Sequence, residues 1–290
     1  MSDRTAGLRG RLPVRAEKFA IRWLHEYAVP AAPTYPVDVS KGITAFGMDG
    51  NDTVGDCGPC AWAHDRMLAG TTMTAQEVID LYLAYTGGQD VGVVLADFLL
   101  YLFHQGLLEG FAPVELTTVD AVMGQFQRGV ILGVNLTADA NTLFNEGKPW
   151  TVANGETPDP AEGHAILKTG AVTATGNGVV VTWGALQVTE YGWEQACVEE
   201  AWAIVTKDDM GETGYAALLA DLQALPSATV TPVPPAPEPP APPVQPPPVV
   251  PPAPVPDIHG FIAEIHQIVD EAKQKLIAAA EAIIHALEHP

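Results

Sequence analysis

Apolar and polar positions divide the chain into a helical first half and a strand-like second half. Four segments of the first half have the long, mixed pattern that is typical of helices. The third is so apolar that we expect it to be buried. Thr74 and Glu77 form a capping box, which marks the start of the second segment. The four predicted helices are residues 57–70, 74–88, 94–110 and 117–129.

After residue 129 the pattern changes. Four short runs are rich in β-branched residues and are bounded by glycine and asparagine, which favours strands. They cover residues 130–136, 163–172, 176–184 and 200–208. Helices followed by antiparallel strands predict an α+β domain.

Residues 226–256 consist mainly of Pro, Ala and Val. A segment with so few backbone donors cannot pack a core, so we expect an extended, polyproline-like linker. At about 3.1 Å per residue it would reach roughly 90 Å.

Residues 257–290 begin at Asp257, a favourable N-cap, and predict an amphipathic helix. A helix on a long linker needs a partner for its apolar stripe, so we expect coiled-coil self-association or docking into a larger assembly. Its polar face is not basic, which argues against binding to a membrane surface. The heptad stripe consists of Ile258, Ile262, Ile265, Val269, Ala272, Leu276, Ala279 and Ile283.

Together these boundaries predict four regions. They are a basic N-terminal arm and helix (1–39), the α+β domain (40–225), the linker (226–256) and the C-terminal helix (257–290).

Charge is distributed unevenly along the chain, whose formal net charge is −21. An acidic body repels nucleic acids and anionic membranes, so neither is expected as a partner. Basic residues near the N-terminus could dock on an acidic partner or on the protein's own acidic surface, and we expect the second. These residues are Arg4, Arg9, Arg11, Arg15, Lys18 and Arg22.

Composition favours a globular protein made in a reducing cytoplasm. With 47% hydrophobic residues in 290, the chain can bury a sizeable core. No apolar run is long enough to span a bilayer, and no apolar segment follows the basic N-terminal residues as in a secretory signal. Three cysteines are too few for a disulfide scaffold.

Two of the three cysteines lie in the stretch GDCGPCAWAH, residues 55–64, which allows three interpretations. Cys57 and Cys60 match the dithiol of thioredoxin-like proteins, but glycines and polar residues precede them where that fold needs a strand. Cys57, Cys60 and His64 could begin a metal site, but no second Cys/His pair follows. For Cys60 and His64, ordinary helix packing is the simpler interpretation. No metal or cofactor is therefore expected.

The third interpretation makes Cys57 a nucleophile. A helix N-terminus supplies positive potential, which favours the reactive thiolate. A distant histidine must accept its proton, a third group must orient that histidine, and two donors must face the developing oxyanion. The backbone N–H of Cys57 and a side-chain amide just upstream would be these donors.

At this point the chain resembles papain-like cysteine peptidases, in the broad sense that includes short bacterial members. The order of elements agrees over most of residues 40–206. Asn51 stands six positions before Cys57, where the family has its oxyanion glutamine, and Cys57 opens a helix as the family's nucleophile does. The resemblance implies a peptide or protein substrate.

The second half of the family pattern lies in the predicted strands. GHAILKTG resembles the strand that carries the catalytic histidine, here His164. VTWG resembles the family's Asn-Ser-Trp-Gly segment, with Thr182 in the place of the histidine-orienting asparagine. Trp183 would shield the pair from water.

A narrower resemblance, carried by NDTVGDC, GHA and TWG, is to proteins of actinobacteria and their phages. It implies an alternative function: a non-catalytic virion protein that decorates a capsid or tail on a papain-like scaffold. The acidic body and the heptad helix favour this alternative.

Departures from the family pattern bear on activity. Asn51 is one methylene shorter than glutamine, and a lost oxyanion donor typically costs about 3–4 kcal/mol of transition-state stabilisation. Thr182 has a shorter reach than asparagine. Asp52 and Asp56 flank the nucleophile and oppose thiolate formation, unless they pair with His164. A helix-like insert at 191–200 also departs from the family. The sequence is therefore compatible with three alternatives: an active enzyme, a weakened enzyme and an inactive one.

Overall fold

A seven-stranded sheet forms the framework of this domain. The computed structural model describes residues 6–13, 21–43, 45–152 and 155–226. Most of the predicted linker and all of the predicted C-terminal helix lie outside these residues, so both stay predictions. Every described residue belongs to one compact unit.

All neighbouring strands in the sheet are antiparallel, in the order β2-β7-β3-β4-β5-β6, and β1 also pairs with β4. Antiparallel strands after a helical first half confirm the predicted α+β organisation. The strands are β1 (Val37–Asp38), β2 (Gly110–Pro113), β3 (Val130–Asn135), β4 (Gly163–Ala171), β5 (Gly178–Thr182), β6 (Ala185–Thr189) and β7 (Val198–Val205).

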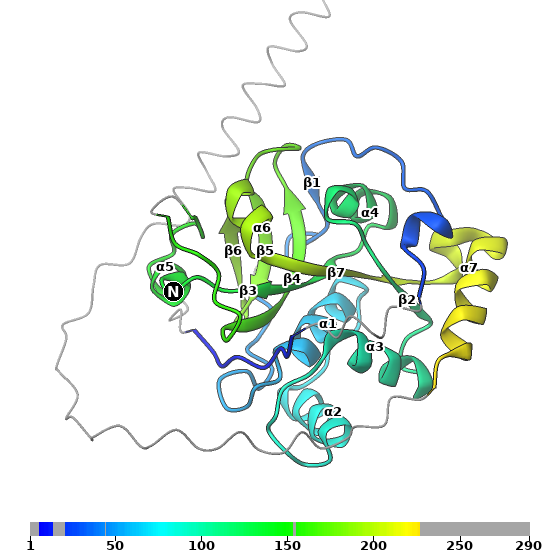
Figure 1. Cartoon of the computed structure of the whole chain (residues 1–290), viewed down its shortest axis with the longest axis horizontal. Coiled ribbons are helices and arrows are strands. Elements are labelled where there is room, and N and C mark those ends of the chain that lie inside the picture. Colours follow the sequence, from blue (N-terminus) through cyan, green and yellow to red (C-terminus); the bar gives the residue numbers. More distant parts are fainter. Residues whose placement is uncertain (1–5, 14–20, 44, 153–154, 227–290) are drawn as a thin grey trace, which may run out of the picture. The chain divides into compact units, whose positions relative to one another are not determined.

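Helices cover both faces of this sheet (Figure 1). In Figure 1, α1, α2 and α3 lie on one side of the long strands β4 and β7, and α4 and α6 lie on the other. The helices are α1 (Cys57–Leu68), α2 (Ala75–Thr86), α3 (Leu95–His104), α4 (Val119–Phe126), α5 (Ala140–Asn145), α6 (Tyr191–Cys197) and α7 (Lys207–Ala224), with short 3-10 helices η2 (Leu24–Glu26) and η3 (Leu116–Thr118).

Helix α1 is buried along nearly its whole length. It packs on β3, β4 and β5 and also contacts α2 and α3, so it has almost no solvent-facing side. Its buried polar residues therefore need partners inside the protein. Asp65 pairs with Arg128 of the loop before β3, and His64 pairs with Asp49.

The four predicted helices and four predicted strands are all present. The third helix ends earlier than expected, at His104 rather than residue 110. Gly106 there adopts a positive φ of 70°, and Leu107 is 40% exposed. The insert before the last strand is helix α6, as its pattern indicated. Within the described part of the chain, no helix has the length and apolar character needed to cross a membrane.

Within the described part of residues 1–39, residues 6–13 are extended and the 3-10 helix η2 is the helical element of residues 21–39. The expected N-terminal helix stays a prediction, because residues 14–20 lie outside the described residues. Residues 6–13, here called the docked segment, make their backbone–backbone hydrogen bonds to other parts of the domain.

Candidate active site

Cys57 is the first residue of α1, and its thiol is almost fully buried. Burial raises the pKa of this thiol to about 11, although the nearby backbone amides of Ala165 and Gly10 lower it, and the charge of Asp56 adds to the rise. The helix N-terminus was expected to favour the thiolate, but here desolvation outweighs it. In this state Cys57 is a neutral thiol.

His164, the second residue of β4, is almost fully buried, with 1% of its surface exposed. Its Nε2 is 2.8 Å from the hydroxyl oxygen of Thr182 at the end of β5. Its Nδ1 is buried and has no hydrogen-bond partner among the described residues. A buried nitrogen without a partner is unusual in a native interior. Nδ1 is thus the atom that is free to accept a proton.

Trp183 holds the other side of this imidazole. The two rings stack, with centroids 4.9 Å apart and planes 30° from parallel. Trp183 and Gly184 form the two-residue turn between β5 and β6, with positive φ angles of 45° and 73°. This conformation matches the twist of a hairpin but is unfavourable for tryptophan. The turn therefore fixes the indole over His164 at a cost in backbone strain.

The sequence-predicted residues meet at one small cavity of about 10 Å³. A space of this size holds one water molecule at most. Helix α1 supplies one wall and strands β4 and β5 supply the other. Among the lining residues are Asn51, Cys57, His164, Thr182 and Trp183.

Asn51, the expected oxyanion donor, is occupied in this state. Its Nδ2 donates to the backbone oxygen of Val54 at 3.3 Å, and its own backbone oxygen accepts a hydrogen bond from Leu8 of the docked segment. The side chain lines the cavity, but it would have to exchange its Val54 partner to bind an oxyanion.

The structure contradicts the thioredoxin-like interpretation of Cys57 and Cys60. The loop before α1 contains turns rather than a sheet strand, and all three cysteines are free. The Cys60 thiol donates to the carboxylate of Asp56 at 3.3 Å. Burial raises the pKa of that carboxyl to about 7. Cys60 therefore packs and hydrogen-bonds inside the domain, as the simpler interpretation held.

His64 also has a structural environment. Its Nε2 lies 3.2 Å from the backbone oxygen of Gly47 and 3.1 Å from Asp49, and the ring meets Phe46 edge-on. Across the residues that the structure describes, no group of three or more His, Cys, Asp or Glu side chains is placed to hold a metal ion.

The docked segment runs past helix α1 (Figure 1, dark blue). Leu8 N donates to Asn51 O at 2.6 Å. Farther along, Val93 N donates to Gly10 O at 2.6 Å and Leu12 N donates to Val93 O at 2.7 Å, which is a parallel β-bridge. The segment therefore lies on the thiol as an extended peptide.

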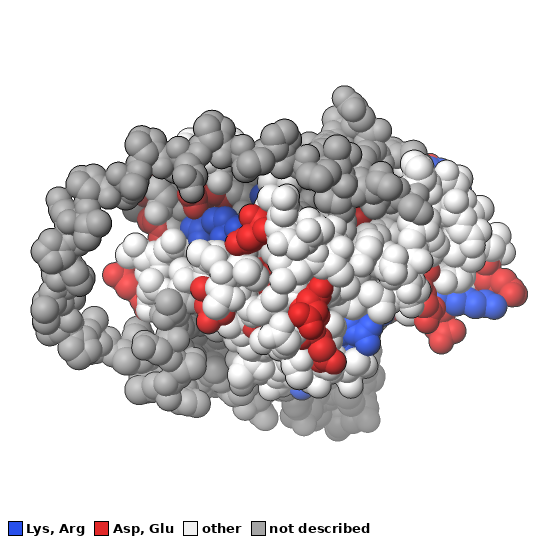
Figure 2. All heavy atoms as spheres, turned by 90° about the horizontal axis from the view of Figure 1, so that it is seen from below, with Lys and Arg blue, Asp and Glu red and all other residues white. Residues whose placement is uncertain are grey.

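Two arginines fasten this segment to acidic residues. Arg9 pairs with Glu162, and Arg11 pairs with Glu199 and Glu200, each at 2.8 Å. This is the docking on the protein's own acidic groups that the sequence favoured. Figure 2 shows the setting: on the face that it presents, Asp and Glu side chains outnumber scattered Lys and Arg.

The same arginines act on the candidate base. Burial lowers the pKa of His164 well below its usual value, and the positive charges of Arg9 and Arg11 lower it further. The lowered pKa of the imidazole and the raised pKa of the thiol favour the uncharged form of both residues, which line the same cavity. From the sequence, Arg9 and Arg11 were recognised as part of a basic N-terminal region but were not predicted to lie at the site. Their acidic partners are more than 150 residues away along the chain.

Comparisons with known proteins were made for sequence and for structure. No protein-family model matches the chain, and no curated protein sequence matches it. The structure of xylellain, a cysteine protease from Xylella fastidiosa, is similar at a TM-score of 0.51 and 12% identity, over 71% of this chain and 98% of that chain.

A second similar structure comes from work on the mite allergens Blo t 1 and Der p 1. Its TM-score is 0.40 at 13% identity, over 61% of this chain and 72% of that chain. At sequence identities this low, the comparisons concern the fold alone. Of these two structures, xylellain has a TM-score above 0.5, so the fold comparison rests on it. The described domain therefore has a papain-like α+β fold, the scaffold of papain-like cysteine proteases.

Proposed function

We propose that this domain is a cysteine peptidase or amidase in which Cys57 and His164 form the catalytic pair. One observation carries the proposal: a buried histidine is held by Thr182 and Trp183, its Nδ1 has no hydrogen-bond partner among the described residues, and it lines the same small cavity as Cys57. Holding the imidazole at Nε2 leaves Nδ1 as the nitrogen that exchanges protons.

The proposed reaction is an acyl transfer. The Cys57 thiol gives its proton to His164 Nδ1, and the sulfur forms a bond to the carbonyl carbon of a peptide or amide. The resulting oxyanion collapses, the C–N bond breaks, and the imidazolium gives its proton to the leaving amine. Water, deprotonated by His164, then cleaves the thioester and releases a carboxylic acid.

Thr182 and Trp183 are positioning residues in this scheme. The Thr182 hydroxyl oxygen accepts a hydrogen bond from Nε2–H and stabilises the imidazolium that forms. Trp183 excludes water from that hydrogen bond, which strengthens it. The backbone N–H of Cys57 and the Asn51 amide would bind the oxyanion once Asn51 leaves Val54.

The docked state is an unreactive one. With the thiol pKa near 11 and the imidazole pKa depressed, proton transfer from sulfur to nitrogen is unfavourable. Removing the docked segment takes two positive charges from His164 and opens the thiol to solvent. Activity is therefore proposed for the state in which the segment has left.

A non-catalytic function on the same scaffold is the second candidate. The buried, neutral thiol of Cys57 and the occupied amide of Asn51 favour it. The heptad helix that suggested a structural role in an assembly lies outside the described residues, so that role is a prediction from sequence.

Hydrolysis of a fluorogenic peptide library separates the two candidates. The assay uses the full chain with the substitution Arg9→Glu. This substitution places a negative charge opposite Glu162 and is expected to loosen the docked segment. Cys57→Ala in this background is expected to abolish hydrolysis, a loss of roughly 10³-fold or more, whereas Cys197→Ala, the matched control, leaves it nearly unchanged. Equal rates with and without Cys57 would rule out the peptidase.

A further inference from the structure

Arg11 lies in a site, here called the seat of Arg11, whose acceptors are Glu199, Glu200, Asn135 and Val134. The Arg11 side chain is fully buried. Its Nε donates to Glu200 and its Nη2 to Glu199, both at 2.8 Å. Its Nη1 donates to Asn135 at 3.0 Å and to the backbone oxygen of Val134 at 3.2 Å. Four acceptors thus surround one guanidinium, the geometry that distinguishes arginine from lysine.

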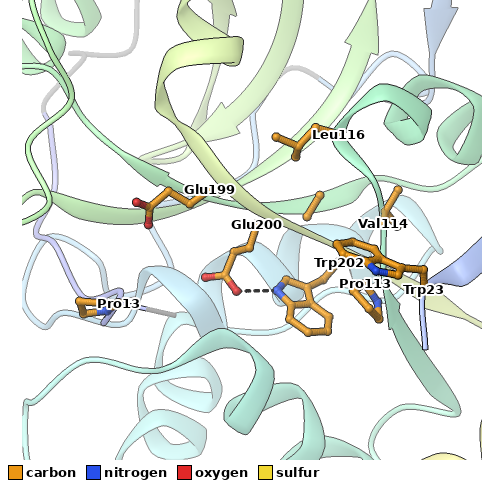
Figure 3. Close-up of a pocket in the computed structure, with 9 residues that line it drawn as sticks. Pro13, Trp23, Pro113, Val114, Leu116, Glu199, Glu200 and Trp202 are labelled. Atoms are coloured by element: carbon orange, nitrogen blue, oxygen red, sulfur yellow. Dashed lines mark hydrogen bonds between the residues drawn. The ribbon is translucent and has the colours of Figure 1, made fainter. Parts of the chain in front are cut away.

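This seat is held in place independently of Arg11. Glu200 Oε2 accepts a hydrogen bond of 2.8 Å from the indole N–H of Trp202, which Figure 3 draws as a dashed line. Asn135 Nδ2 donates to the carboxylate of Glu199. Figure 3 also places Pro13, two residues after Arg11, at the edge of the adjoining pocket. Both carboxylates are thus held by hydrogen bonds to which Arg11 does not contribute.

Glu200 is 7% exposed with Arg11 in place, and a carboxylate buried to this extent needs a cation beside it. In its buried state the seat therefore requires a guanidinium. The docked segment is one source, and another peptide of the same chemistry would satisfy the same acceptors.

Arg9, two residues before Arg11, has a second seat of its own. Its Nε pairs with Glu162 and its Nη2 donates to Asn141 at 2.8 Å. The guanidinium also lies over the Trp183 ring, 5.2 Å from its centroid. Trp183 therefore joins this seat directly to the candidate base.

Between the two seats only glycine fits. A Cβ on Gly10 would overlap the backbone of Gly55, and a Cβ on Gly92 would overlap the backbone of Gly10. A Cβ on Gly55 would lie 2.6 Å from Arg9 O, closer than any real contact. The peptide and the walls thus meet backbone to backbone at the thiol.

We propose that the cleft beside Cys57 is a binding site for extended peptides that carry the sequence Arg-Gly-Arg, and that residues 6–13 are its resident occupant. As a statement about substrate class it rests on the proposed function; as a statement about binding it does not. The residues that determine specificity are Glu162 for the first arginine, Gly55 and Gly92 for the glycine, and Glu199 and Glu200 for the second arginine.

The test displaces the resident segment from the full chain. Gly10→Val introduces a side chain that overlaps Gly55, and Leu8→Val, at a position 43% exposed in the same segment, is the matched control. Alkylation of Cys57 by iodoacetamide is followed by mass spectrometry, with Cys60 and Cys197 as internal references. We expect Gly10→Val to speed alkylation of Cys57 by about tenfold or more, since that residue loses its cover. Leu8→Val should not change the rate.

A synthetic peptide of residues 6–13 is then added to the Gly10→Val chain. It should restore protection of Cys57, and a peptide with lysine at both arginine positions should protect less well. Peptides with glutamate at both positions, or with valine for the glycine, should not protect. If Gly10→Val does not fold, as judged by circular dichroism, the Arg9→Glu chain takes its place in the same assay.

Each outcome bears on one of the two proposals. Protection that ignores the arginines or the glycine, or no protection in a folded chain, would overturn the Arg-Gly-Arg site and show that residues 6–13 are only a structural strap. Specific protection without any hydrolysis by Cys57 would keep the binding site and remove the enzyme. Hydrolysis of peptides that do not compete with residues 6–13 would keep the enzyme and remove this site.

Discussion

At the scale of single residues, the site depends on what each polar atom is bonded to. In the proposed mechanism Thr182 orients His164, and its hydroxyl lies 2.8 Å from His164 Nε2. Asn51 is the proposed oxyanion donor, but its amide is bonded to Val54. The proposed role of Thr182 therefore has its contact in place, and that of Asn51 does not.

Replacing Thr182 tests this difference. Thr182→Val keeps the shape of the side chain but leaves Nε2 without a partner, so we expect kcat to fall roughly 10²-fold with little change in KM. Thr182→Ser keeps the hydroxyl and should recover most of the rate. The measurement is steady-state hydrolysis in the Arg9→Glu background. Equal rates for the Val and Ser variants would show that Thr182 does not position His164.

Asp56 gives the domain a predictable pH dependence. Burial raises its pKa from 3.8 to about 7 in the folded state, so the folded protein holds a proton that the unfolded chain has released. Stability from this group is complete below about pH 4 and is lost as the pH rises to about 7, on the order of 4 kcal/mol.

Urea unfolding between pH 4.5 and 7.5 measures this effect. Asp56→Asn, which is neutral at every pH, should flatten the curve, whereas the same change at exposed Asp52 should leave its slope as in the wild type. An unchanged slope in Asp56→Asn would assign the pH dependence to other groups.

At the scale of elements, the hairpin of β5 and β6 does two tasks. Its strands extend the sheet, and its turn places Trp183 on His164. Gly184 is essential to the turn for two reasons: its φ is 73°, and a Cβ there would lie 2.7 Å from the backbone of Gly47. Burial of the indole against Phe144 and Trp150 offsets the strain at Trp183.

Two glycine-to-alanine substitutions distinguish the cost of a positive φ angle from the cost of a steric clash. Gly87 caps α2 with a φ of 67° and has open space around it, so Gly87→Ala should cost only the backbone strain, about 1–2 kcal/mol. Gly184→Ala adds a backbone clash and should cost clearly more, and it should also shift Trp183 fluorescence. Chemical denaturation gives both values. Equal losses would mean that the loop at Gly47 adapts without cost.

At the scale of the whole domain, one end of the chain completes an interior built by the rest. Arg11 joins the paired strands β3 and β7 through Asn135 and Glu200. Arg22, also near the N-terminus, pairs with Asp221 on α7, but at the surface. The N-terminal region thus contains one buried and one exposed ion pair whose effects on stability can be compared.

Arg11→Met measures the buried interaction. It leaves Glu200 without its cation, and we expect a loss of about 3–5 kcal/mol in the free energy of unfolding. Adding Glu200→Gln should recover part of this loss, since the uncompensated charge is removed. Arg22→Met is the control and should change stability little, because its partner is solvated. A small loss in Arg11→Met would show that the seat tolerates being empty.

The local pattern of apolar and polar residues was sufficient to predict helices and strands that consist of one continuous, largely buried segment. The predicted helices at 57–70 and 74–88 and the strand that carries His164 are present with nearly the expected bounds. Short β2 was missed because Gly110–Pro113 has a proline and no alternation, and β6 was missed because it follows a turn of only two residues.

Long-range pairing explains the remaining differences. The order of motifs predicted that Cys57, His164, Thr182 and Trp183 belong to one site, and they line one cavity. The docked segment was not predicted there, because its position depends on partners such as Glu200, 189 residues away, and on glycine contacts that have no local signature.

In the proposed peptide site, covalent continuity gives the docked segment a property that a free peptide lacks. Because it belongs to the same polypeptide as the cleft, its effective concentration is set by the chain and is on the order of millimolar for a short connection. Dilution therefore does not empty the cleft. A competing peptide must exceed that local concentration or bind more tightly, or the chain must be cut between segment and domain, before the thiol becomes available.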